Sequence, residues 1–275
     1  MKWRRCQVFS SLRLFPLSEC ARLDVPRSHP RYVSLRTRET LSSGLEKGLV
    51  AIQGLIAHGR GEAFDYLLGE RTTPQAAKAE KAAAALLILA GNPAISVNGN
   101  VAALASKQVV ALSKAISAKI EVNLFYRTES RMRKVAESLR RSGARVVLGM
   151  RPDARIPGLD SKRALCSREG IFSADVILVP LEDGDRTQAL ARMGKVVLAI
   201  DLNPLSRTST AATVTIVDEL TRALPRITSF ARELKGRRAY AERVATSFDN
   251  RKNLGDVLRH IEARLDRLSS MNRCD

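Results

Sequence analysis

Residues 175–187, DVILVPLEDGDRT, decide the fold of this chain. An apolar run of strand length is followed at once by acidic residues and glycine, and then by the start of an amphipathic helix. Residues 195–203, KVVLAIDLN, have the same form and end in Asp201 and Asn203. Short apolar runs that alternate with helical stretches are typical of a parallel sheet whose strands are joined by crossover helices.

The same pattern extends outward in both directions from these two segments. It predicts six strands, at residues 94–97, 119–125, 145–148, 175–180, 195–200 and 213–217, with helices between them at 106–117, 128–142 and 186–193. We therefore expect an α/β fold with a doubly wound, mostly parallel, Rossmann-like sheet and with helical segments at both ends of the chain.

The flanking segments have helical patterns. Residues 34–68 predict helix interrupted by a turn at 57–62, and Thr73 with Pro74 predicts the capped start of an alanine-rich helix that ends near Leu89. Residues 229–268 predict charged amphipathic helices, which pack on the sheet or form an oligomer interface. We divide the chain into an N-terminal extension at 1–25, predicted to be disordered, and a single domain at 26–275: helical at 26–92, sheet core at 93–225 and helical tail at 226–275.

Composition excludes several classes of protein. A hydrophobic fraction of 45% in 275 residues is enough for a core, and no apolar run approaches the length of ~20 residues that a membrane-spanning helix needs. The arginine- and serine-rich N-terminus superficially resembles an organellar transit peptide but lacks the apolar core of a secretory signal. The four cysteines, Cys6, Cys20, Cys166 and Cys274, are far apart, and only three histidines are present, so we predict a cytoplasmic protein with neither disulfides nor a protein metal cage.

The charge balance predicts an anionic ligand. The 46 Lys and Arg residues exceed the 28 Asp and Glu residues, which gives a formal charge of +18. Nucleic acid, acidic lipid and phosphorylated small molecules all fit such a charge. A basic nucleic-acid-binding protein is therefore one alternative, although aromatic residues make up only 4% and the basic residues are dispersed or lie near acidic ones.

Polar residues follow five of the predicted strands. Each cluster alone is an ordinary turn former or helix cap, but the carboxyl ends of parallel strands meet at one edge, which is where open α/β sheets bind ligands. Asp201 is suited to a ribose hydroxyl or a cation, and Arg207 with Thr208 to a phosphate, so a nucleotide is favoured, with Mg²⁺ carried in by it. Residues 58–62, HGRGE, predict an exposed turn whose backbone N–H groups are open to an anion.

Two common nucleotide cradles are absent from the sequence. Neither GxxxxGK[ST] nor GxGxxG follows any predicted strand. A dinucleotide-dependent oxidoreductase on the same kind of sheet therefore stays an alternative that the missing glycine fingerprint disfavours.

Six longer strings, ordered along the chain, carry a resemblance. They are SHPRY at 28–32, GLIAHGRGEAFDYL at 54–67, ISVNGNVAAL at 95–104, EVNLFYRT at 121–128, VPLEDGDRT at 179–187 and DLNPLSR at 201–207. Together they closely resemble the archaeal phosphopantothenate synthetase family, also called 4-phosphopantoate:beta-alanine ligase. The resemblance runs from about residue 26 to the C-terminal helices.

The resemblance implies an ATP-dependent ligase of archaeal coenzyme A biosynthesis. Such an enzyme joins 4-phosphopantoate to beta-alanine, releases AMP and diphosphate, and works as a homodimer without a nucleic-acid or membrane partner. The ATP contacts that it implies in this sequence are Arg38, Arg60, Asp201, Leu202, Asn203, Arg207, Thr208, Glu219 and Leu220. The family usually has Asn where this chain has Glu219, which puts a side-chain contact there in doubt.

Physical reasoning supplies roles for further residues. Two polyanionic substrates in one crevice need arginines to offset their repulsion, and formation of an acyl-adenylate needs orientation and charge stabilisation by arginines, N–H groups and Mg²⁺. The amine of beta-alanine must also lose protons, for which we consider three candidate catalytic residues: His58, Glu62 and Asp185. Candidates for binding phosphopantoate lie at neighbouring strand ends: Asn98, Asn100, Asn123 and Arg127.

Overall fold

The computed structural model describes residues 25–271. Apart from Val25, the predicted N-terminal extension lies outside the described residues, as do Cys6, Cys20 and Cys274. The chain forms two compact units, one ending at Glu39 and the other beginning at Thr40, and helix α1 (Tyr32–Glu46) contains this boundary. The pocket and the sheet described below belong entirely to the second unit. The predicted division at residues 26, 93 and 226 stays a prediction.

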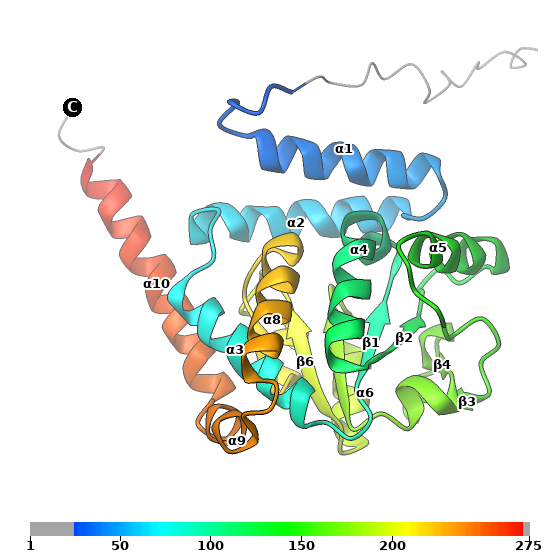
Figure 1. Ribbon diagram of the computed structural model, residues 1–275. Coiled ribbons are helices and arrows are strands. Elements are labelled where there is room, and N and C mark those ends of the chain that lie inside the picture. The colour runs from blue at the N-terminus through cyan, green and yellow to red at the C-terminus, as the bar shows by residue number, and fades with distance from the viewer. Residues whose placement is uncertain (1–24, 272–275) are drawn as a thin grey trace, which may run out of the picture. The chain divides into compact units, whose positions relative to one another are not determined.

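A five-stranded parallel sheet forms the centre of the second unit (Figure 1). Its order is β2-β1-β5-β6-β7, and registered pairs such as Val176–Val196 and Pro180–Ile200 align the two central strands along their length. The strands are β1 (Ala94–Val97), β2 (Lys119–Val122), β5 (Val176–Pro180), β6 (Val196–Ile200) and β7 (Val214–Ile216). This topology confirms the predicted doubly wound α/β fold.

Helices cover both faces of the sheet. The α-helices of this unit, besides the second half of α1, are α2 (Ile52–Leu68), α3 (Pro74–Leu89), α4 (Gly99–Ile116), α5 (Glu129–Arg141), α6 (Gly184–Arg192), α7 (Arg207–Ala211), α8 (Leu220–Leu234), α9 (Arg238–Thr246) and α10 (Asn250–Met271). Alternate residues of β5 face opposite ways: Leu178 joins the core under α3, α4 and α8, whereas Ile177 and Val179 join the core under α6. Burial on both faces explains why these strands are continuous apolar runs.

The described residues contain no helix that combines the length and the apolar character required to cross a bilayer.

The predicted strand at residues 145–148 is wrong. That segment makes a single parallel bridge to β2, in which Leu148 donates its N–H to the carbonyl of Ile120 (2.9 Å) and accepts from Val122 (3.0 Å). Gly149 follows with a φ of +94°, a conformation that glycine adopts readily, and turns the chain away from the edge. A short antiparallel pair, β3 (Ala154–Arg155) with β4 (Leu165–Cys166), follows and was not predicted.

The predicted turn at residues 57–62 is also wrong, because these residues lie within α2. Their N–H groups donate to carbonyls one helical turn earlier and are not open to an anion. Glycine in a helix costs about 1 kcal/mol, but here it permits close packing. A Cβ atom at Gly54 would overlap the carboxamide of Asn100, and one at Gly61 would lie 3.8 Å from Leu202.

Capping residues set the starts of α4 and α3, and the first of these starts differs from the prediction. Helix α4 begins at Gly99, seven residues before the predicted start, because the Asn98 side chain accepts the N–H of Val101 (3.1 Å). The start of α3 is as predicted, with Thr73 accepting the N–H of Ala76 (3.1 Å) and Pro74 in the first turn. In both helices a side-chain oxygen satisfies an N–H group that has no partner within the helix.

Candidate active site at the carboxyl ends of the strands

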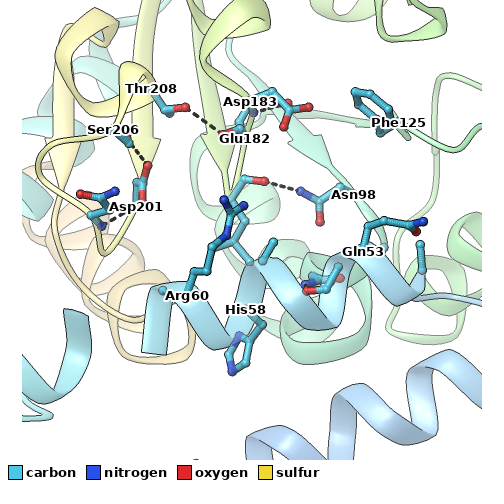
Figure 2. Close-up of a pocket in the computed structure, with 18 of the residues that line it drawn as sticks. Gln53, His58, Arg60, Asn98, Phe125, Glu182, Asp183, Asp201, Ser206 and Thr208 are labelled. Atoms are coloured by element: carbon cyan, nitrogen blue, oxygen red, sulfur yellow. Dashed lines mark hydrogen bonds between the residues drawn. The ribbon is translucent and has the colours of Figure 1, made fainter. Parts of the chain in front are cut away.

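A cavity of about 800 Å³ lies between α2 and the loops that follow β1, β5 and β6 (Figure 2). This is at the upper end of the range of about 300–1,000 Å³ that is usual for small-molecule sites. Among the residues that line it are Gln53, His58, Arg60, Asn98, Asn100, Phe125, Arg163, Glu182, Asp183, Asp201, Asn203, Ser206, Arg207 and Thr208.

We define the β6 end of the pocket as Asp201, Leu202, Asn203, Ser206, Arg207 and Thr208. The Asp201 carboxylate accepts the N–H of Asn203 (2.9 Å) and the hydroxyl of Ser206 (2.5 Å). Ser206 in turn caps α7 by accepting the N–H of Ser209 (2.9 Å). Burial raises the pKa of Asp201, and these hydrogen bonds oppose the rise. Because a carboxylate has about four acceptor positions, Asp201 can accept further bonds from a ligand.

Two residues of the β6 end start helix α7. The Arg207 guanidinium is exposed and lies 2.8 Å from the exposed carboxylate of Asp185. Thr208 is buried and donates its hydroxyl to the carbonyl of Glu182 (2.8 Å), so it joins the loop after β6 to the loop after β5. A Cβ at Gly184 would lie 2.5 Å from that of Arg207, so glycine is needed there for the two helix starts to approach.

We define the β5 end of the pocket as Asn98, Arg163, Glu182 and Asp183. The Glu182 carboxylate, 2% exposed, forms ion pairs with two guanidinium groups, those of Arg163 and Arg186. Arg186 is completely enclosed and also donates to the hydroxyl of Ser96 (3.0 Å). Asp183, by contrast, has a half-exposed side chain 3.6 Å from Arg163.

Burial of these arginines has an electrostatic consequence. Loss of hydration lowers the pKa of Arg163 to about 9 and that of Arg186 to about 10. Both values lie above neutral pH, so both guanidinium groups stay charged. The carboxylate of Glu182 pairs with both cations, Asp183 lies 3.6 Å from Arg163, and the carboxylate of Glu121 also attracts Arg186, so acidic side chains offset the charge of these buried arginines.

Two helix N-termini at the pocket provide partial positive charge. Gly99 and Asn100 at the start of α4, and Asp183 and Gly184 at the start of α6, all line the pocket. The N-terminus of a helix presents unpaired N–H groups and a partial positive charge, and it favours anions.

Asn98 fixes the two loops relative to each other. Its amide donates to the carbonyls of Pro180 (3.2 Å) and Leu181 (2.9 Å) while its oxygen caps α4. Leu181 has a φ of +53°, which is rare for a residue with a side chain and often occurs near functional sites. Because both amide donors are occupied, the side chain of Asn98 positions the loop.

Helix α2 closes the side of the pocket opposite the strand ends. Figure 2 shows Arg60 pointing from α2 toward the strand-end residues, and among the described residues it forms no ion pair with a carboxylate. His58 belongs to the lining, but its imidazole points away from Asn98, Asp183 and Asp201. Asn100 donates its amide to the carbonyl of Gly54 (2.8 Å) and attaches α2 to α4.

The pocket brings together many of the residues predicted from sequence, and their roles stay predictions. Those that line it are His58, Arg60, Asn98, Asn100, Asp201, Leu202, Asn203, Arg207 and Thr208. Those outside the lining are Glu62, Asp185, Asn123, Arg127, Glu219 and Leu220. Arg38 lies on α1 in the unit that ends at Glu39, and its contact with ATP also stays a prediction.

Several of the residues outside the lining form hydrogen bonds with other residues of the chain. Glu62 accepts the hydroxyl of Tyr66 (3.0 Å), and Glu219 caps α8 by accepting the N–H of Thr221 (2.7 Å). Asn123 is buried and donates to the carbonyls of Arg163 (3.2 Å) and Leu165 (2.9 Å). Arg127 donates to the carbonyl of Gly149 (2.5 Å), and burial lowers its pKa.

Sequence reasoning missed Arg163, Glu182 and Asp183 as members of the site. Glu182 and Asp183 were visible as polar residues after a strand, but nothing in the sequence distinguished them from Asp185. Arg163 lies in the short 3₁₀ turn Lys162–Ala164 and reaches the pocket through tertiary packing with Asn123, so no local pattern identifies it.

The described part of the chain contains no group of three or more His, Cys, Asp or Glu side chains that could hold a metal ion. Mg²⁺ usually keeps several waters and takes only one or two carboxylates together with substrate phosphates. The donor set at the β6 end, with Asp201 as its carboxylate, therefore fits an ion that is bound mainly by a nucleotide.

Comparison with known proteins gives one consistent result. A profile described as phosphopantothenate/pantothenate synthetase matches residues 75–264. A protein of Thermococcus onnurineus named 4-phosphopantoate--beta-alanine ligase is 55% identical over 89% of this chain and 95% of its own length. A protein of the same name from Methanosarcina mazei is 52% identical over 90% of this chain and 98% of its own length. This chain belongs to the phosphopantothenate/pantothenate synthetase family.

Proposed function

We propose that this protein is a 4-phosphopantoate–beta-alanine ligase of coenzyme A biosynthesis, and that it uses ATP and releases AMP and diphosphate. The observation that carries the proposal is identity of 52–57% to four proteins of that name, over 76–90% of the chain. The pocket supports it with two helix N-termini, arginines from four elements and a nucleotide-compatible carboxylate at one edge of the sheet.

ATP binds at the β6 end in this proposal. Arg60 from α2 and Arg207 from α7 face phosphate oxygens, and Asp201 accepts a hydrogen bond from a ribose hydroxyl. Leu202 supplies apolar contact, and Asn203 and Thr208 shape the loop around the nucleotide. Two further ATP contacts that the resemblance implies are included: Glu219 and Leu220.

The second anionic substrate, 4-phosphopantoate, binds at the β5 end. The N-termini of α4 and α6 attract its phosphate and carboxylate, and Asn100 lies at the first of these termini. Asn98 positions the loop after β5 through its hydrogen bond to the carbonyl of Leu181. Asn123 positions the turn that carries Arg163 through its hydrogen bond to the carbonyl of that residue. Arg127 lies behind this layer and contributes positive charge.

The reaction then has two displacements. A carboxylate oxygen of 4-phosphopantoate attacks the α-phosphorus of ATP, the bond to diphosphate breaks, and an acyl-adenylate forms. The amine of beta-alanine then attacks the carbonyl carbon of the acyl-adenylate, and AMP leaves. The residues of the pocket orient the reactants and stabilise developing charge, so no covalent enzyme nucleophile is required. His58, Glu62 and Asp185 remain the candidate acceptors of amine protons.

Mg²⁺ accompanies ATP in this proposal and neutralises phosphate charge when bound. Asp201 retains acceptor capacity and is the carboxylate of the β6 end that fits this ion, as the alternative to its bond with a ribose hydroxyl. We also propose a homodimer in the cytoplasm, as the family resemblance implies. The mass of the protein by light scattering tests the dimer.

The decisive experiment supplies purified protein with ATP, Mg²⁺, 4-phosphopantoate and beta-alanine, and follows AMP and 4'-phosphopantothenate. Omission of any one component should abolish formation of 4'-phosphopantothenate. Activity that persists without beta-alanine, or a requirement for NAD(P) in place of ATP, would contradict the proposed function.

Replacing either Arg60 or Asp201 by Ala should raise the KM for ATP by about tenfold or more, because each removes a charged partner worth about 1.5–3 kcal/mol. Steady-state kinetics with ATP as the varied substrate measures the change. Arg238→Ala, on the exposed surface of α9, is the matched control and should leave the KM for ATP unchanged. Unchanged ATP kinetics in both pocket variants would remove these residues from the nucleotide site.

A further inference from the structure

Beta-alanine differs in charge from the other two proposed substrates. ATP and 4-phosphopantoate are polyanions, whereas beta-alanine is a zwitterion whose amine nitrogen must reach the activated carboxyl and lose a proton before it attacks. The arginines and helix N-termini of the pocket suit the carboxylate of beta-alanine but not its ammonium group. A carboxylate that is accessible from the cavity is the side chain suited to that ammonium group.

Three carboxylates line the cavity within the described residues: Glu182, Asp183 and Asp201. Glu182 is 2% exposed and is paired with two arginines. Asp201 accepts two hydrogen bonds inside its own loop and belongs to the β6 end. Neither therefore offers a freely accessible carboxylate to a third substrate at the β5 end.

Asp183 has the required properties. Its side chain is 53% exposed, and its one ion pair among the described residues is with Arg163 at 3.6 Å. It occupies the N-cap position of α6, yet its carboxylate makes no capping hydrogen bond. Since Asp is a favoured N-cap residue that usually bonds the N–H two or three positions on, this carboxylate is unusual in remaining available.

The position of Asp183 also suits a reactant that joins the other two. Figure 2 shows its carboxylate on the side of the pocket near Phe125, away from Arg60 and Asp201. The Thr208 hydroxyl bond to the carbonyl of Glu182 places the residue directly before Asp183 next to the β6 loop. Asp183 therefore lies at the β5 end, and only the backbone of the residue before it contacts the loop of the proposed nucleotide site.

We propose that Asp183 binds the ammonium group of beta-alanine and orients its nitrogen toward the activated carboxyl. This rests on the proposed function and assigns one substrate of the same site. Arg163 is the cation nearest to Asp183, at 3.6 Å, which is longer than a direct hydrogen bond. Because Arg163 is also paired with Glu182, it leaves the Asp183 carboxylate able to bind an ammonium group.

The test compares two nucleophiles in the variant Asp183→Asn. Asparagine has nearly the same size and is an equally good N-cap, so the start of α6 is retained. With ATP, Mg²⁺ and 4-phosphopantoate present, the KM for beta-alanine should rise about ten- to a hundredfold, the loss expected for a charged hydrogen-bond partner. Hydroxylamine, which is uncharged near neutral pH, should form the hydroxamate at an unchanged rate.

The matched control is Asp249→Asn, which changes an aspartate at the start of α10 that accepts the N–H of Lys252 (3.0 Å) and does not line the pocket. It should leave both reactions unchanged. Equal kinetics of Asp183→Asn and wild type with beta-alanine would overturn the assignment. The assignment would also be overturned if Asp183→Asn lowered the rates with beta-alanine and with hydroxylamine equally, or if it raised only the Mg²⁺ concentration that the reaction requires. Either result would indicate that Asp183 acts in formation of the acyl-adenylate. If wild-type protein forms neither the hydroxamate nor the amide, the proposed function itself fails.

Discussion

The two ends of the pocket are held by different interactions. The β6 end is built mainly from hydrogen bonds of hydroxyl and amide groups around the Asp201 carboxylate, between residues two to six positions apart, and Thr208 adds one bond to Glu182, 26 positions away. The β5 end is built from buried charge, and its partners lie up to 90 positions apart. Local turns thus shape one end, and the packing of distant segments shapes the other.

The largest effect is expected from a substitution at the β5 end. Glu182→Gln leaves two buried guanidinium groups without their shared anion, so the free energy of unfolding should fall by about 3–5 kcal/mol. Urea denaturation measures it, with Asp183→Asn as the comparison at the adjacent, half-exposed position. A loss for Glu182→Gln no larger than that for Asp183→Asn would show that burial of the pair is not what holds this end.

A buried carboxylate outside the pocket, that of Glu80, tests how much an ion pair offsets the burial of a charged group. Glu80, on α3, bonds Arg226 through one oxygen (2.6 Å), while its other oxygen has no partner among the described residues. Burial raises the pKa of Glu80 from 4.5 to about 7, against the opposing effect of Arg226. The folded protein therefore binds this proton more tightly than the unfolded chain does, and the free energy of unfolding should fall as the pH rises from about 4.5 through about 7.

Glu80→Gln should remove this fall, so that the variant gains on the order of 2 kcal/mol relative to wild type between the low and the high end of that range. Denaturation at a series of pH values measures the difference. Glu262→Gln, on the exposed surface of α10, serves as the control and should follow the wild-type curve. Parallel curves for Glu80→Gln and wild type would contradict the prediction.

The smallest expected effect concerns the β6 end. Ser206→Ala removes the cap of α7 and one bond to Asp201, and should lower stability by about 1 kcal/mol. Thermal unfolding measures the stability, and the KM for ATP should rise in the same variant because Asp201 loses the bond that orients it. Thr210→Ala, an exposed neighbour on the same helix, is the control. A loss as large as that of Glu182→Gln would remove the contrast between the two ends.

This contrast also explains what could be predicted from the sequence. Asp201, Arg207 and Thr208 were singled out from the sequence because they follow a predicted strand within a short segment, although the helix that begins at Arg207 was not predicted. The parallel sheet was predicted for the same reason, since each strand and helix has its own local period. Arg163 was not found, because its contact with Glu182 arises only when β4 and the turn before it pack beside β2.

The two structural errors have a related cause. Local rules interpret Gly59 and Gly61 as a turn, but both continue α2, and the close approach of α2 to another segment is at Gly54, next to Asn100. The apolar residues 145–148 have strand character, but the positive φ at Gly149 ends pairing after one bridge. In each case a tertiary constraint overrode the local preference.

The glycines of α2 have a mechanical consequence. A methyl group at Gly54 would meet the Asn100 carboxamide, so this side chain would have to move and its bond to the carbonyl of Gly54, which attaches α2 to α4, would be disturbed. Arg60 lies about 1.7 turns further along the same helix. A position without a side chain thus permits the attachment of the helix that carries Arg60, and we expect that enlarging it weakens the proposed contact of Arg60 with ATP, although Gly54 itself need not touch the nucleotide.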